Sequence, residues 1–373
     1  MSRPLPLLAA TTLALSLAAC TTPEKEPASA ETASTVEAPP TIETLAAPRA
    51  NVDLRWEEWA PVGVASARLD WPAGAAWAQG KLYLVGTRKL RAPGVGRGPR
   101  AEIVLTNLSP RGAEEVADFP SRFAERAEAA LAASPDNRLW LVGGNYTPPP
   151  INLAPEGRLD YTELGTPVGE VYAWSPGADD LKLETFLPVP RGEAAAFFYG
   201  GDLYVVAGLY DAANPDDVNN LQVHKYEPAE GLWTKYHDLP VPLAGPAAAV
   251  ARGGLYVIGG KQLKPAFISN AVFRYDLEVF KWQRLPSAPA PRMGARAYVV
   301  GGHLYLLGGC EAEGLGTPAR MGLKTYRLDV EANRWEELAT PLPEGTTLTA
   351  YDGSYFYVVG VEKTYRGRLV KAP

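Results

Sequence analysis

Cysteine and histidine are both scarce in this sequence. The chain of 373 residues contains two Cys and three His. After Cys20 only Cys310 remains, so the folded part of the chain cannot form a disulfide within itself. His224, His237 and His303 show neither the His-x-His nor the His-x-x-x-His spacing of a metal site. We therefore expect no metal and no other cofactor.

Positive charge is also in short supply. The 36 Lys and Arg residues are outnumbered by 42 Asp and Glu residues, which gives a net charge of −6. An acidic chain without a strong basic stripe lacks the electrostatic attraction that nucleic-acid binding requires. The sequence also shows no Gly-rich phosphate loop, no nucleophile elbow and no Ser-His-Asp order. These absences argue against nucleic acid as a partner and leave no complete catalytic set in view.

The first twenty residues have the pattern of an export signal. Arg3 provides a positive start, and Leu5 to Ala19 is apolar, uncharged and too short for a comfortable membrane span. The next residue is Cys20, and the run Leu17-Ala18-Ala19-Cys20 resembles the lipobox of bacterial lipoproteins. That resemblance implies lipidation of Cys20 and anchoring in the cell envelope, with the outer membrane or periplasmic side favoured by Thr21. An ordinary signal peptide with a chance Cys is the alternative.

Aromatic residues are absent from the segment that follows. Residues 21–50 contain no Phe, Trp or Tyr and are rich in Pro, Ala, Thr and Glu. Such a segment cannot bury enough apolar surface to fold. We expect a disordered tether over residues 21–50 and a folded domain over residues 51–373.

The rest of the chain is a repeat. An apolar strand that ends in small residues, as in Leu255-Tyr256-Val257-Ile258-Gly259-Gly260, returns six times, with its aromatic residue at positions 83, 140, 204, 256, 305 and 357. Each copy has a small-residue strand before it and further strands with Tyr and Trp after it. Four strands at a period of about fifty residues are typical of one propeller blade. The sequence predicts an all-β, six-bladed β-propeller with four antiparallel strands per blade.

This pattern resembles the kelch family. Its hallmark is a Gly pair after an apolar strand, then a Tyr, then a Trp in the last strand, as in Gly259, Gly260, Tyr275 and Trp282. The resemblance covers about residues 54 to 370. The first two units depart from it, because the first lacks a fourth-strand Trp and the second uses Phe186 in that place.

The sixth unit lacks a fourth strand of its own. The chain ends soon after the strand Tyr365 to Val370, whereas Leu54 to Pro61 closely resembles the fourth strand Arg334 to Leu338. We expect the N-terminal strand to complete the sixth blade, which removes the exposed edge of a linear array.

Three loops differ most between the repeats, and propeller function is concentrated in such loops. They are Thr87 to Arg100 with five cations, the Pro-rich insertion Asn145 to Glu170, and Asp211 to Asn220 with three acidic residues. Each joins the second and third strands of a blade, so all three should emerge on the same side. Ordinary solvated loop charge is the alternative for each of them.

A second set of charged residues lies where the chain enters the innermost strands. These ligand-binding candidates are Arg126, Glu128, Arg191, Glu193, Arg292 and Arg296. Arg and Glu around a channel could bind a carboxylate or a sugar acid. They could equally form ion pairs between blades, and the sequence favours this structural role.

Two functions fit these observations. The first is a monomeric, non-catalytic binding or scaffolding module that presents one mouth of the propeller to a protein or glycan, and is held at the membrane through lipid on Cys20. The resemblance to kelch propellers implies this use of the loops. The second is a periplasmic carbohydrate-active enzyme, because the exported N-acetylneuraminate epimerases resemble this chain. Glu193 and Arg296 are the catalytic candidates under the second hypothesis.

Overall fold

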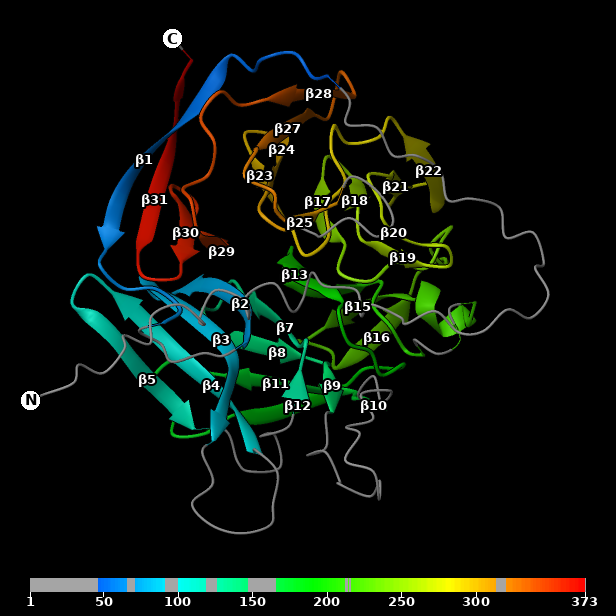
Figure 1. Ribbon diagram of the computed structural model, residues 1–373. Coiled ribbons are helices and arrows are strands. Elements are labelled where there is room, and N and C mark those ends of the chain that lie inside the picture. Colours follow the sequence, from blue (N-terminus) through cyan, green and yellow to red (C-terminus); the bar gives the residue numbers. More distant parts are fainter. Residues whose placement is uncertain are drawn as a thin grey trace, which may run out of the picture.

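The computed structural model describes residues 46–65, 71–90, 100–118, 126–146, 166–211, 214, 216–312 and 320–372. The predicted lipidation site and nearly all of the predicted tether lie outside these residues. Over the described residues, six four-stranded antiparallel sheets surround a central axis (Figure 1). This arrangement confirms the predicted six-bladed propeller.

The first three blades follow the chain from its N-terminal half. Blade 1 consists of β2 (Trp71–Ala78), β3 (Lys81–Leu90), β4 (Arg100–Ser109) and β5 (Gly112–Asp118). Blade 2 consists of β7 (Ala130–Ala133), β8 (Leu139–Val142), β11 (Glu170–Trp174) and β12 (Lys182–Phe186). Blade 3 consists of β13 (Ala195–Tyr199), β14 (Asp202–Val206), β15 (Val223–Glu227) and β16 (Leu232–Lys235).

The other three blades complete the ring. Blade 4 consists of β17 (Ala247–Ala251), β18 (Gly254–Ile258), β21 (Val272–Asp276) and β22 (Lys281–Leu285). Blade 5 consists of β23 (Arg296–Val300), β24 (His303–Leu307), β27 (Tyr326–Asp329) and β28 (Arg334–Glu337). Blade 6 consists of β29 (Thr346–Tyr351), β30 (Phe356–Gly360), β31 (Thr364–Lys371) and β1 (Val52–Ala60).

The first strands of all six blades line the axis. Each contacts the first strands of the two neighbouring blades, so the ring is closed. Small side chains permit this crowding, and every residue of β17, whose sequence is AAAVA, is buried. The core lies between the blades, where the second-strand aromatics such as Tyr256 and Tyr305 pack against apolar residues of the adjacent sheet.

In blades 3, 4 and 5 a fourth-strand tryptophan fastens the blade to the one before it. Each indole N–H donates a hydrogen bond to the preceding blade: Trp233 to Thr185, Trp282 to His237 and Trp335 to Pro286. Phe186 does not take this role in blade 2, which corrects the sequence interpretation. Its side chain is 58 % exposed, and a phenyl ring has no N–H to donate.

The N-terminal strand closes the ring as predicted. β1 pairs antiparallel with β31 along its length, with Leu54 opposite Leu369, and Leu54 is buried in the core of blade 6. Pairing begins earlier than the predicted end of the tether, because Pro48 and Ala50 already form backbone hydrogen bonds with Glu337 of blade 5. Among the described residues, no helix is long and apolar enough to cross a bilayer.

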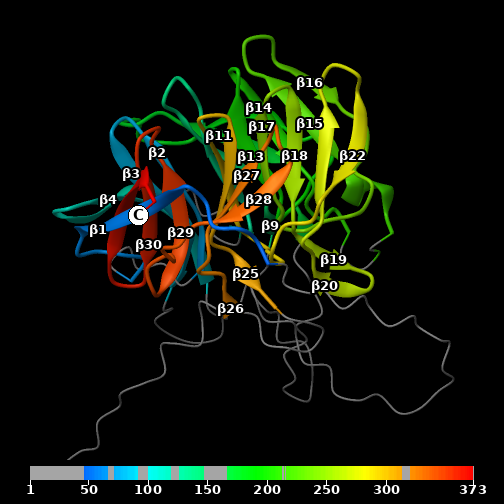
Figure 2. The same cartoon turned by 90° about the horizontal axis from the view of Figure 1, so that it is seen from above.

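Short additional strands extend from one side of the propeller. They are β6 (Arg126–Ala127), β9 (Asn145–Tyr146), β10 (Thr166–Pro167), β19 (Lys261–Leu263), β20 (Ala266–Ile268), β25 (Cys310–Glu311) and β26 (Arg320–Met321). A 3-10 turn, η2 (Val218–Leu221), lies between β14 and β15. Figure 2 shows the β19–β20 and β25–β26 hairpins projecting on the same side. The predicted loop Thr87 to Arg100 is shorter than expected, because β3 runs to Leu90 and β4 begins at Arg100.

Candidate functional site

One backbone position recurs just before the first strand of four neighbouring blades. It is occupied by Glu128, Glu193, Gly245 and Gly294, all with positive φ, at 56°, 52°, 57° and 71°. Each N–H in this series donates to the carbonyl oxygen of the same position one blade back: Glu193 to Glu128 at 3.1 Å, Gly245 to Glu193 at 2.8 Å and Gly294 to Gly245 at 2.7 Å. These four residues, called the inner ring below, therefore curve around one mouth of the channel.

The two glutamates occupy a conformation that suits glycine. A left-handed backbone costs a residue with a side chain about 1–2 kcal/mol, and such outliers gather at functional sites. Blades 4 and 5 avoid this cost with Gly245 and Gly294, whereas blades 2 and 3 accept it with Glu128 and Glu193. The exception points to a role for the two carboxyl groups beyond folding.

A second ring surrounds the first. In each of these four blades, two small residues follow the second strand. The residue after this pair forms a backbone bridge to the residue that precedes the inner-ring position. This outer ring consists of Asn145 bridged to Ala127, Leu209 to Gly192, Lys261 to Ala244 and Cys310 to Met293. The two rings therefore place the outer-ring side chains beside the inner-ring glutamates.

Asn145 and Lys261 act directly on the two carboxyl groups. The Nδ2 atom of Asn145 donates to Oε2 of Glu128 at 2.5 Å. Gly192 makes room for this contact, because a Cβ there would lie 2.4 Å from the same Nδ2 atom. The positive charge of Lys261 favours the ionised form of both Glu128 and Glu193, and so opposes the rise in pKa that their surroundings cause.

Despite Lys261, both glutamates hold protons more tightly than usual. Crowding by protein around the half-buried side chain, followed by the nearby Glu128 carboxyl, raises the pKa of Glu193 from 4.5 to about 8. Crowding by protein raises the pKa of Glu128 too, although water still reaches its side chain and the Asn145 hydrogen bond opposes the shift. Because neighbouring like charges resist simultaneous ionisation, Glu193 keeps its proton near neutral pH.

Arg296 brings a cation into the channel itself. It begins β23, where the matching residues of the three preceding blades are Ala130, Ala195 and Ala247. One of its guanidinium nitrogens lies 3.5 Å from where a Cβ on Gly74 of blade 1 would be, so the side chain reaches across the channel. Two residues on, the hydroxyl of Tyr298 pairs with that of Thr349 at 2.9 Å, and burial raises the pKa of Tyr298 to about 12.

Arg191 belongs to the framework of blade 3. It is 1 % exposed, and its guanidinium donates to the carbonyl oxygens of Val189, Ala207 and Gln222. A fourth contact, at 2.7 Å, joins it to Nδ1 of His224. Burial, and then the charge of Arg191, lowers the pKa of His224 to about 3, so the neutral imidazole accepts this hydrogen bond. Four of the five guanidinium N–H groups are thus used within the blade, and the side chain is almost fully buried.

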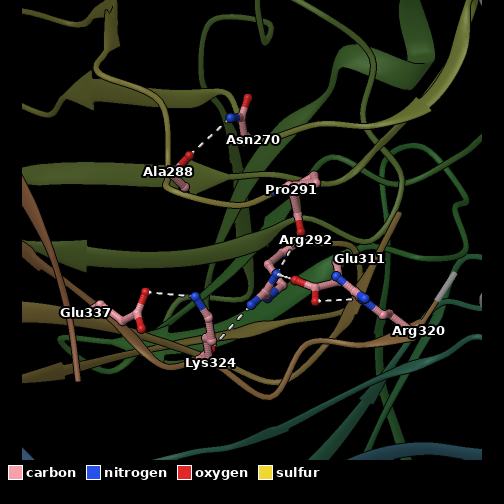
Figure 3. A network of polar contacts seen from close by, with 8 residues as sticks. All are labelled: Asn270, Ala288, Pro291, Arg292, Glu311, Arg320, Lys324 and Glu337. Atoms are coloured by element: carbon pink, nitrogen blue, oxygen red, sulfur yellow. Dashed lines mark hydrogen bonds and ion pairs between the residues drawn. The ribbon is translucent and has the colours of Figure 1, made fainter. Parts of the chain in front are cut away.

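Arg292 has the same framework role in blade 5 (Figure 3). It is 1 % exposed, is paired with the carboxylate of Glu311, and donates to the carbonyl oxygen of Lys324 at 3.3 Å. Glu311 also pairs with Arg320 at 3.2 Å, and the ammonium group of Lys324 pairs with Glu337 at 3.2 Å. This network ties the β25–β26 hairpin to β28.

The six candidate residues therefore separate into two groups. Glu128, Glu193 and Arg296 gather at the channel, whereas Arg191 and Arg292 are buried in blades, and the side chain of Arg126 lies outside the described residues. Sequence reasoning missed Lys261, and it placed Asn145 only within a long loop. The available signal was their position directly after a small pair, which the outer ring makes equivalent from blade to blade.

The acidic loop of blade 3 is occupied with local contacts. Asp216 pairs with Lys264 of the β19–β20 hairpin at 2.8 Å, and Asp217 accepts from the N–H of Asn219 at the start of η2. Among the residues that the structure describes, no group of three or more His, Cys, Asp and Glu side chains is arranged to hold a metal ion. Most of the Thr87 to Arg100 and Asn145 to Glu170 loops lies outside that part of the chain.

Comparison with known families identifies kelch repeats in the part of the chain that forms blades 3 to 6. The family model described as the KLHDC2/KLHL20/DRC7 Kelch-repeats domain matches residues 192–369. This segment begins at the outer-ring bridge of blade 3 and ends in β31.

Two kinds of individual proteins are similar to the chain. The N-acetylneuraminate epimerase of Shigella sonnei (strain Ss046) is 34 % identical over 106 residues, which are 27 % of this chain and 28 % of the relative. The protein of the same name from Escherichia coli (strain K12) is 33 % identical over the same coverage. The chain thus aligns with 28 % of the length of these curated relatives. A solved structure, "Structure of YjhT", superposes with a TM-score of 0.55 over 82 % of this chain and 94 % of the other at 16 % identity, which supports the fold alone.

Proposed function

We propose that this chain, a six-bladed β-propeller whose residues 192–369 match a kelch-repeat family model, binds a sugar acid at the inner-ring mouth and catalyses exchange between the anomers. The observation that carries this proposal is the pair Glu128 and Glu193. The two residues are joined by a backbone hydrogen bond, both have positive φ, and both carboxyl groups have raised pKa values.

Anomer exchange of a cyclic hemiketal needs an acid and a base together. The base removes the proton of the anomeric hydroxyl, the acid protonates the ring oxygen, and the bond between that oxygen and the anomeric carbon breaks. The resulting open-chain ketone rotates, and the same steps in reverse close the ring on its other face. No electrons leave the substrate, and a carboxyl pair that shares one proton supplies both groups at once.

The assignment of the two groups follows from their surroundings. Glu193 has its pKa raised to about 8 and is the acid at neutral pH. Glu128 accepts a hydrogen bond from Asn145, which favours its charged form, and is the base. Arg296 forms no hydrogen bond or ion pair with any residue that the structure describes, so its guanidinium is available to a substrate carboxylate.

The names of the curated relatives support this choice of chemistry, because N-acetylneuraminate is a sugar acid and its epimerases match part of this chain. The predicted lipid on Cys20 would hold the channel mouth near a membrane of the cell envelope. Under this proposal the exposed loops select the substrate.

The test is the rate at which one anomer of N-acetylneuraminate equilibrates, followed by proton NMR on a freshly dissolved sample. We expect the rate above the buffer background to increase in proportion to protein concentration. A rate equal to that of buffer would rule out the proposal for this sugar. If the sugar nevertheless raised the melting temperature by mass action, the non-catalytic binding module would be the better account.

A further inference from the structure

Lys261 differs from the other residues around the carboxyl pair in its charge and in how its backbone is held. It is the cation of the outer ring, and two backbone hydrogen bonds to Ala244, at 2.8 and 2.9 Å, fix its position. Gly245, the residue after Ala244, donates its N–H to the carbonyl oxygen of Glu193. The backbone of Lys261 is therefore tied to Glu193 through a continuous set of hydrogen bonds.

Among the described residues, no side chain competes with the carboxyl pair for the ammonium group of Lys261. It forms no hydrogen bond or ion pair with another residue in the described part of the chain, whereas Lys264 in the same hairpin pairs with Asp216 at 2.8 Å. Its charge lowers the pKa of Glu128 and of Glu193. We propose that Lys261 is a positioning residue whose ammonium group sets the pH range over which the carboxyl pair works as acid and base.

This inference rests on the proposed function and deepens it. Asn145 on β9 also contacts the pair but is uncharged, and the guanidinium of Arg296 on β23 extends toward Gly74 of blade 1. Lys261 on β19 is the cation whose charge acts on both members. Without it, neither carboxyl group would ionise until a higher pH.

The variant Lys261→Met tests the proposal through the pH dependence of anomer exchange. Activity requires one protonated and one ionised carboxyl group, so it should fall as the pH rises through the pKa of Glu193 and fall as the pH drops through that of Glu128. Loss of the cation raises both pKa values. We expect the whole bell-shaped profile to move upward by roughly half to one pH unit, while Lys261→Arg keeps the wild-type profile.

The matched control is Lys264→Met, which removes the same charge from the same hairpin but away from the pair. Its pH profile should equal that of the wild type. If Lys261→Met raises KM without moving the profile, Lys261 binds substrate and the proposal is overturned.

A second readout does not depend on activity. Because the folded protein holds a proton on Glu193 that the unfolded chain loses, stability falls as the pH rises between 4.5 and about 8. In Lys261→Met this fall should extend to higher pH, as measured by thermal unfolding from pH 4 to 10. An unchanged curve would refute the role of Lys261, whereas a shifted curve in a protein without exchange activity would refute only the proposed function.

Discussion

Deletion of residues 46–61 should abolish the cooperative unfolding of the propeller. The deletion removes β1, the fourth strand of blade 6, and leaves β31 as an open edge. Leu54 alone is 2 % exposed and packs against Tyr305 and Phe356, and truncating such a residue costs about 2–5 kcal/mol. The whole strand contributes more than that, which approaches the 5–15 kcal/mol of total stability typical of a domain.

Polar contacts at this closure add to the expected loss. The carboxylate of Asp53 accepts hydrogen bonds from the N–H and the hydroxyl of Thr340, at 2.9 and 2.8 Å, which joins β1 to blade 5. The measurement is thermal unfolding followed by circular dichroism, with a chain lacking residues 21–45 as the control that should unfold like the full chain. If the chain without β1 unfolds cooperatively within a few degrees of the wild type, the closure does not hold the ring together.

Glu193→Gln should reduce the rate of anomer exchange by about 10²–10⁴-fold. Glutamine keeps the size of the side chain and can donate a hydrogen bond, but it cannot transfer a proton. Glu128→Gln should cause a loss of similar size. The double variant should be little worse than either single one, because two residues that act as a unit are strongly non-additive.

Glu193→Gly separates this loss from misfolding. Glycine relieves the positive φ of 52° as Gly245 and Gly294 do in their blades, so we expect a gain in stability on the order of 1 kcal/mol. An inactive protein that is more stable than the wild type would show that the glutamate is retained for chemistry. A less stable Glu193→Gly variant, or one with full activity, would contradict this account.

The sequence predicted the scaffold well because the scaffold is repetitive. Six copies of one strand give the number of blades, and the likeness of Leu54 to Pro61 to a fourth strand gives the closure that β1 and β31 form. Phe186 was misinterpreted because the second unit lacks the fourth-strand Trp, and Phe186 is the aromatic residue near that place in the sequence. The indole N–H that clasps the preceding blade, as in Trp282, has no counterpart in a phenyl ring.

The site was only partly predictable, for a geometric reason. Arg191 and Glu193 are two residues apart, yet one is buried among carbonyl groups and the other lies at the channel mouth. The left-handed turn at Glu193 separates them, and a sequence does not state that a glutamate will adopt it. Lys261 was missed because its neighbours in space, Glu128 and Glu193, belong to other blades.

The most direct test of the central claim is a titration of the glutamate carboxyl groups by carbon-13 NMR from pH 3 to 10. We expect one resonance, that of Glu193, to titrate with a pKa of about 8. This resonance should vanish in Glu193→Gln and titrate at lower pH in Glu128→Gln, because a like charge is gone. If every glutamate titrates with an ordinary pKa near 4.3, the two carboxyl groups share no proton at neutral pH, and the proposed acid and base pair does not exist.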